Sequence, residues 1–97
     1  MWWLYVVECR GGSLYTGIAI DVARRYEQHC SGLGAAYTRM RPPLRLLGTM
    51  PVGTRSDALK LEYTFKQLSA TEKRARATTM ELPDALRTIA AERVGTS

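Results

Sequence analysis

The first apolar run of this chain has no polar side, and this feature constrains the fold most. Residues 2–7 (WWLYVV) are aromatic or β-branched at odd and at even positions, which suits a strand covered on both faces. We therefore place this strand at the centre of a sheet. The run is too short to cross a membrane and is followed at once by Glu8. We expect no membrane partner and a cytoplasmic protein.

A glycine pair follows the first strand and predicts a reversal of the chain. Residues 10–13 (RGGS) suit a tight turn, and residues 14–18 (LYTGI) resume the strand pattern, so the two runs should form a hairpin. Asp21 is a good N-cap for a helix over residues 22–30, which the SGLG segment at 31–34 ends.

The middle of the chain predicts one more strand. We expect residues 36–43 to form a loop, because its two prolines exclude a helix, and residues 44–50 to form the third strand. Thr54 with Asp57 three positions later resembles a capping box and opens a helix.

Three helices are expected to complete the fold. They cover residues 54–68, 71–77 with Thr71 as a candidate cap, and an amphipathic stretch at 84–94. The order ββαβααα predicts a single α+β domain over residues 1–97, with a small three-stranded, mainly antiparallel sheet flanked by helices.

The charge balance points to an anionic partner. Fourteen Lys and Arg against nine Asp and Glu give a net charge of +5 and a pI of about 9.6, which favours nucleic acid or another anionic surface. Cys9 and Cys30 read as buried reduced thiols. His29 beside Cys30 offers two ligands, whereas a structural zinc ion needs four.

Polar residues gather on one flank of the helix at 22–30. At 100° per residue, Arg25 and His29 lie together beside the apolar stripe, facing the strand that carries Tyr15. A lone histidine in such a place is more often a hydrogen-bonded core residue, and Arg25 could pair with Glu8 or Asp21. A phenol, a guanidinium and an imidazole brought together make a functional site the stronger interpretation.

Glu62 lies inside the apolar arc of the next long helix, where a carboxylate needs a cation. Lys66, four residues later, could supply it as an ordinary helix pair. The alternative is a magnesium ion held by this carboxylate together with waters and phosphate oxygens. The two interpretations stay open at this point.

These residues resemble the GIY-YIG nuclease superfamily. WLY at residues 3–5 stands in place of Gly-Ile-Tyr, and YTG at 15–17 in place of Tyr-Ile-Gly, with both tyrosines and the final glycine present. The arginine and histidine of the family fall on Arg25 and His29, and its metal-binding glutamate falls on Glu62.

The resemblance covers about residues 2–76 and leaves a C-terminal tail at 77–97. It is closest to the small single-domain bacterial branch, which also resembles the nuclease module of the eukaryotic structure-specific endonuclease that cleaves Holliday junctions. The loop at 34–43 (GAAYTRMRPP) is similar to this branch too.

The resemblance implies a phosphodiester hydrolase that uses Mg²⁺ (or Mn²⁺). Glu62 would bind the metal, Arg25 would grip the scissile phosphate with its planar donor fork, and Tyr5 would orient or deprotonate the water. Tyr15 and His29 would complete the catalytic group. Spacing does not decide which of Tyr5, Tyr15 and His29 is the general base.

The expected substrate is DNA, cut in a structure-selective way in repair or recombination, by a monomer or weak dimer with a protein partner for targeting as an option. The predicted substrate-binding residues are Gly17, Arg24, Arg39, Arg41 and Lys66, and weaker candidates are Arg55, Lys73, Arg74 and Arg76. Two alternatives remain: a non-catalytic nucleic-acid-binding module of the same fold and, ranked lower, a basic protein–protein adaptor.

Overall fold

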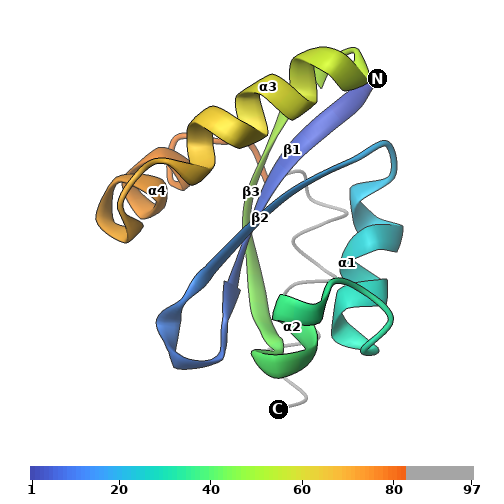
Figure 1. Ribbon diagram of the computed structural model, residues 1–97, viewed down its shortest axis with the longest axis vertical. Helices are drawn as coiled ribbons and strands as arrows, with labels where there is room; N and C mark the ends of the chain where they lie inside the picture. Colours follow the sequence, from blue (N-terminus) through green and yellow to red (C-terminus); the bar gives the residue numbers. More distant parts are fainter. Residues whose placement is uncertain (83–97) are drawn as a thin grey trace.

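A three-stranded antiparallel sheet forms the centre of the molecule. The computed structural model describes residues 1–82, so the helix expected at 84–94 lies outside the described residues. The strands β1 (Trp2–Cys9), β2 (Leu14–Ala19) and β3 (Pro43–Gly53) lie in the order β2-β1-β3 (Figure 1). The strand with two apolar faces is thus central, as predicted, and its residues 4–7 are buried in the cores on both sides of the sheet.

The β1–β2 hairpin fixes which side chains face each other. Its turn is the short 3₁₀ segment η1 (Arg10–Gly12), in which Gly11 and Gly12 have φ of +84° and +82°. These angles lie in the left-handed region that favours glycine. The resulting register places Tyr5 opposite Gly17 and Val7 opposite Tyr15.

Two pairs of helices cover the two faces of the sheet. Helices α1 (Val22–Cys30) and α2 (Ala36–Met40) lie on one side of the sheet, and α3 (Arg55–Lys66) and α4 (Ala70–Ala77) on the other (Figure 1). The core of the first face includes Tyr5, Val7, Tyr26 and Leu46, and the core of the second includes Leu4, Val6, Phe65 and Ala77. Within residues 1–82, no helix has the length and apolar character needed to cross a membrane.

The segment after α1 corrects one prediction. Residues 36–40 form helix α2 rather than part of a loop, and β3 begins already at Pro43 and continues to Gly53. Proline disfavours helix at its own position and at the residue before it, so Pro42 and Pro43 end the helix without preventing it upstream.

Side-chain caps set the starts of the longer helices. The Asp21 and Thr54 side chains accept hydrogen bonds from the first turns of α1 and α3, as predicted. For α4 the cap is Ser69, not Thr71: Ser69 and Glu72 form a reciprocal capping box that begins the helix two residues earlier. A complete box satisfies two backbone donors, which Thr71 in its own position could not do.

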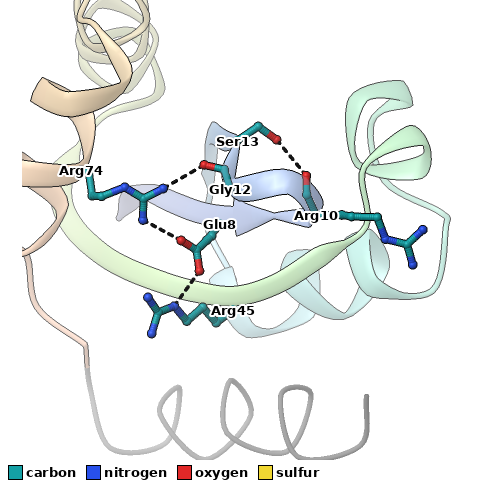
Figure 2. A network of polar contacts seen from close by, with 6 residues as sticks. All are labelled: Glu8, Arg10, Gly12, Ser13, Arg45 and Arg74. Atoms are coloured by element: carbon teal, nitrogen blue, oxygen red, sulfur yellow. Dashed lines mark hydrogen bonds and ion pairs between the residues drawn. The ribbon is translucent and has the colours of Figure 1, made fainter.

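An ion-pair network joins α4 to the hairpin turn (Figure 2). The Glu8 carboxylate accepts hydrogen bonds from Arg74 Nη1 at 2.6 Å and from Arg45 Nε at 2.9 Å, and Arg74 Nη2 donates to the Gly12 carbonyl at 2.8 Å. The Arg74 hydrogen bond is the main cause of a lowered Glu8 pKa. Glu8 is therefore not a partner of Arg25, one of the two pairings that the sequence allowed.

Candidate active site

Tyr5 lies directly above a glycine of the neighbouring strand. The Tyr5 side chain is buried, with 1% of its surface exposed, and crosses β2 at Gly17. A Cβ at Gly17 would lie 2.5 Å from the Tyr5 hydroxyl oxygen, closer than real Cβ contacts. The missing side chain at Gly17 is thus what allows the phenol to reach across β2; a contact between Gly17 and substrate remains a prediction.

Beyond Gly17, the Tyr5 hydroxyl meets the side chain of His29. His29 is 1% exposed, and its Nε2 lies 2.7 Å from the Tyr5 hydroxyl oxygen. Its Nδ1 lies 2.8 Å from Thr38 Oγ1 of α2, and a Cβ at Gly34 would collide with this nitrogen. Burial, with the charge of Arg25 as second cause, lowers the His29 pKa to about 4. The imidazole is therefore neutral at pH 7.

Tyr15 extends the cluster along β2. Its ring centroid lies 5.0 Å from that of His29, 6.4 Å from that of Tyr5 and 5.8 Å from that of Tyr37, all in tilted arrangements. Such contacts are favourable geometries for aromatic pairs. Burial raises the pKa of both Tyr5 and Tyr15, so both phenols are protonated at neutral pH.

Two cations flank the aromatic rings. The Arg41 guanidinium lies 5.3 Å from the centroid of Tyr37, and Lys66 Nζ lies 5.9 Å from the centroid of Tyr15. Both distances are within the range of cation–π attraction. The predicted substrate-binding residues Arg41 and Lys66 therefore border the cluster, while Arg24 and Arg39 are exposed on α1 and α2.

Arg25 lies beside the phenols on α1. Its Nη1 donates a hydrogen bond of 3.0 Å to Gln28 Oε1, so neither Glu8 nor Asp21 is the partner that the structure gives it. Its positive charge lowers the pKa of Tyr5 and of Tyr15. The guanidinium is thus close enough to act on both hydroxyls, and the half-buried side chain keeps access to solvent.

Glu62 reaches the same cluster from α3. Its Oε2 lies 3.6 Å from Lys66 Nζ, and 19% of its side chain is exposed. The charge of Glu62 raises the pKa of Tyr5 and Tyr15, which places the carboxylate near both phenols. Glu62 thus pairs with Lys66, as predicted, and also lies beside the candidate catalytic tyrosines. This geometry is compatible with both a structural ion pair and a metal ligand.

The chemistry of this carboxylate suits a magnesium ion better than a metal with several protein ligands. Within residues 1–82 no three His, Cys, Asp or Glu side chains lie close enough to hold a metal together. Mg²⁺ is commonly bound through one or two carboxylates, with waters and phosphate oxygens as the other ligands. A single, partly exposed Glu62 fits this pattern.

Three residues of the cluster have no counterpart in the sequence predictions: Gly34, Tyr37 and Thr38. Thr38 is 1% exposed and Gly34 packs against His29, so both shape the histidine environment. The prediction of a loop at 36–43 hid them, because a loop gives no side-chain direction. A predicted helix starting at Ala36 would have fixed the side-chain direction of Thr38 and placed Tyr37 and Arg41 near it.

A separate cavity lies away from this cluster. It has a volume of ≈ 330 Å³ and lies between β3, α3 and the segment after α4, with Met50, Leu61, Phe65, Arg76 and Met80 among its lining residues. None of the five catalytic candidates lines it. The aromatic cluster, rather than this cavity, is therefore the candidate active site.

Comparison with known proteins defines the class. The family model of the GIY-YIG catalytic domain matches residues 1–75, and the chain belongs to this family. The family is a nuclease superfamily whose members typically use divalent metals, and membership suggests binding to nucleic acid. The three-stranded sheet with its helices matches the GIY-YIG fold, which confirms the predicted fold class.

The relatives within this class are small bacterial proteins. The chain is 57% identical over 74 residues to a UPF0213 protein of Cupriavidus necator, covering 76% of this chain and 80% of that protein. A UPF0213 protein of Cupriavidus pinatubonensis is 51% identical over 83 residues, with coverage of 86% and 92%. The solution NMR structure of a UPF0213 protein from Bacillus halodurans has 35% identity, a TM-score of 0.48 and coverage of 100% and 95%.

Proposed function

We propose that this protein is a Mg²⁺-dependent endonuclease that hydrolyses phosphodiester bonds in DNA. One observation carries the proposal: Tyr5, Tyr15, Arg25, His29 and Glu62 come from β1, β2, α1 and α3 and influence one another at a single site. Hydrogen bonding and burial alone would explain His29, but they do not explain a guanidinium and a carboxylate placed around the same phenols.

The site divides the hydrolysis between its residues. Arg25 exchanges Gln28 for the scissile phosphate, to which its planar fork donates two hydrogen bonds. Tyr5 and His29, joined by the 2.7 Å hydrogen bond, take the proton from the attacking water. Glu62 would hold the Mg²⁺ ion, which supplies Lewis-acid stabilisation of the developing charge when bound. Tyr15 borders the phosphate and packs against the imidazole.

The proposed DNA surface is sequence-independent. Arg24, Arg39 and Arg41 project from α1 and from the end of α2, and their charges would contact phosphate oxygens on either side of the cut. Cutting would then depend on the shape of branched or flapped DNA, with a role in repair or recombination. Such a substrate implies a cytoplasmic protein.

A second candidate is a nucleic-acid-binding module without turnover. The observation that favours it is the ion pair between Glu62 and Lys66, because a carboxylate already neutralised by lysine has less need of a metal ion. Both candidates predict salt-sensitive DNA binding, so only product formation separates them.

The deciding experiment measures cleavage. Purified protein is incubated with labelled branched, flapped and single-stranded DNA, in Mg²⁺, in Mn²⁺ or in EDTA. We expect nicking that EDTA abolishes and that Arg25→Ala abolishes without unfolding. Arg10→Ala is the matched control, since this arginine is exposed at the hairpin turn. Bound DNA with no product under every metal would support the binding module instead.

A further inference from the structure

A buried chain of hydrogen bonds continues behind the catalytic histidine. The Tyr5 hydroxyl lies 2.7 Å from His29 Nε2, and His29 Nδ1 lies 2.8 Å from Thr38 Oγ1. Thr38 Oγ1 in turn lies 2.9 Å from the Ala35 carbonyl oxygen. Tyr5, His29 and Thr38 are each 1% exposed, so water does not compete for these groups.

The direction of each hydrogen bond follows from the far end of this chain. A carbonyl oxygen can only accept, so the one proton of the Thr38 hydroxyl goes to Ala35. If that proton pointed to His29 instead, two oxygen lone pairs would face each other at 2.9 Å in a buried place. Thr38 Oγ1 therefore accepts, and the Nδ1 of His29 must carry a proton.

The near end is compatible with the same tautomer. A neutral imidazole with its proton on Nδ1 has a free lone pair on Nε2, which accepts the proton of the Tyr5 hydroxyl. In the opposite tautomer Nε2–H would donate to Tyr5, and the phenolic proton would need another buried acceptor. The other side chain that hydrogen-bonds this hydroxyl is Arg25, and a guanidinium can only donate, so it offers no acceptor for the phenolic proton.

We propose that Thr38 is a positioning residue that holds His29 in the Nδ1–H tautomer, so that Nε2 is always ready to take the proton of Tyr5. Gly34 supports this arrangement, because a side chain there would push against Nδ1 and turn the ring. The backbone of α2 anchors the hydroxyl at N3, the position where a threonine reaches back to the Ala35 carbonyl. Helix α2 is thus a part of the site.

This tautomer also defines a proton path for catalysis, a step that rests on the proposed function. The attacking water gives a proton to the Tyr5 oxygen while Tyr5 gives its own proton to Nε2. His29 becomes an imidazolium whose Nδ1–H stays on Thr38. The hydroxide forms a bond to phosphorus, the bond to the 3′ oxygen breaks, and that oxygen takes a proton from solvent. His29 then returns its proton to the Tyr5 oxygen, which releases one to water at the substrate side, and this restores the starting state.

His29 is the chain's only histidine, so its tautomer can be measured directly. Long-range ¹H–¹⁵N correlation spectra of the imidazole assign the protonated nitrogen without any nuclease assay. We expect Nδ1–H in the wild type and in Thr38→Ser, which keeps the hydroxyl. Thr38→Val, of the same shape, should move the population toward Nε2–H. Tyr5→Phe should leave Nδ1–H in place, because the proposal assigns the choice of tautomer to Thr38.

A matched control separates this role from helix stability. Thr78 makes the same hydrogen bond to the carbonyl three residues back, at 2.6 Å, on an exposed part of the chain, so Thr78→Val should change neither tautomer nor nicking. In the cleavage assay Thr38→Val should lower kcat about 10- to 100-fold with KM unchanged, and Thr38→Ser should restore it.

Several results would overturn the assignment. They are a wild-type spectrum with Nε2–H, loss of Nδ1–H in Tyr5→Phe, or an unchanged Nδ1–H population in folded Thr38→Val. If Thr38→Val does not fold, the wild type, Thr38→Ser and Tyr5→Phe still decide. A wild type that cuts no DNA but shows these tautomers would refute the nuclease proposal and leave the role of Thr38 intact.

Discussion

The two halves of the candidate site are built in different ways. The buried half, Tyr5 with His29 and Thr38, is proposed to handle protons; each of its residues is 1% exposed, and hydrogen bonds of 2.7 and 2.8 Å join them. The half with the charges is open: Arg25 is half-buried against Gln28, and 19% of the Glu62 side chain is exposed beside Lys66. The fold fixes the buried half, whereas a ligand could replace Gln28 and Lys66 as the partners of Arg25 and Glu62 in the open half.

This difference says where reorganisation occurs on binding. Buried, fully hydrogen-bonded groups keep one geometry, because leaving any one of them unpaired is unfavourable by about 1–3 kcal/mol. Exposed ion pairs contribute about 0–1 kcal/mol, so phosphate or metal can displace them readily. We expect substitutions in the open half to reduce activity with little loss of stability, and substitutions in the buried half to affect stability as well.

The largest expected effect is on activity, in the open half. Glu62→Gln keeps the size of the side chain but removes the charge proposed to hold Mg²⁺, so nicking should fall about 10²- to 10³-fold. The melting temperature should stay within about 2 °C of the wild type, because the pair with Lys66 contributes only a few tenths of a kcal/mol.

Glu27→Gln, on the exposed side of α1, is the matched control for this substitution. Nicking rate, DNA affinity and melting temperature are measured on one preparation of each variant. Undiminished nicking by Glu62→Gln would leave Glu62 as a structural partner of Lys66 and would remove the metal from the proposed mechanism.

The next effect tests the buried half through pH. Burial and the Arg25 charge lower the His29 pKa from 6.5 to about 4, so the unfolded chain binds more protons than the folded one between these values. The contribution of His29 to the free energy of unfolding is therefore complete above pH 6.5 and decreases as the pH falls toward 4. At about 1.4 kcal/mol per pH unit, the total decrease is roughly 3 kcal/mol.

An NMR titration of the single imidazole, with denaturation curves at each pH, checks this prediction. Tyr5 and Tyr15 face the ring as protonated phenols, and Arg25 is the cation beside it. Glu8 adds its own loss of stability only below its usual pKa of 4.5. A His29 midpoint near 6.5 in the folded protein would show that this half is not shielded from water.

The third prediction concerns the contact between Gly17 and the Tyr5 ring. Gly17→Ala would put a Cβ 2.5 Å from the Tyr5 hydroxyl oxygen, so we expect a loss of about 1–3 kcal/mol from overpacking. A double-mutant cycle with Tyr5→Leu supplies the control, because Tyr5→Phe would leave the ring carbon Cζ 2.6 Å from the new Cβ, whereas leucine removes the ring. Purely additive losses in the cycle would mean that Tyr5 and Gly17 do not depend on each other.

The exposed arginines of α2 should affect binding alone. Arg39→Ala combined with Arg41→Ala should reduce the slope of log affinity against log salt by about 1.4–1.8, since each lost phosphate contact contributes about 0.7–0.9. Arg10→Ala and Arg45→Ala, combined, match this change in charge at the hairpin turn and on β3, outside α2. Equal slopes for the two double variants would exclude α2 from the DNA surface.

The smallest effect is expected at the ion pair in the open half. Lys66→Met should change the free energy of unfolding by a few tenths of a kcal/mol, as is usual for such pairs on helices. Chemical denaturation measures this change. A loss above about 1 kcal/mol would mean that the pair is structural and that the open half is as fixed as the buried one.

Sequence reasoning recovered what depends on local pattern. The central position of β1 followed from a run with two apolar faces, and the shared flank of Arg25 and His29 followed from helical spacing. The family resemblance, rather than periodicity, linked Glu62 to these residues, and the structure places its charge near the same phenols.

What the sequence did not reveal are contacts through space. Nothing in the spacing of Thr38 and Gly34 shows that both meet the Nδ1 side of His29. The partner of Arg25 was missed for a similar reason: Gln28 lies on the same helix face, and a charge-based argument considers only carboxylates. The start of α4 was misplaced because Ser69 and Glu72 together outcompete a single candidate cap.

The network of Figure 2 sets an order for folding during synthesis. Glu8 and Arg74 are 66 positions apart, so at about 5–20 residues per second the hairpin is made roughly 3–13 s before its anchor on α4. Throughout that interval the left-handed glycine turn exists without the hydrogen bond from Arg74 to Gly12. We expect nascent chains halted before residue 74 to be cut by protease at this turn, and full-length chains to resist; equal resistance would show that the turn is stable without its anchor.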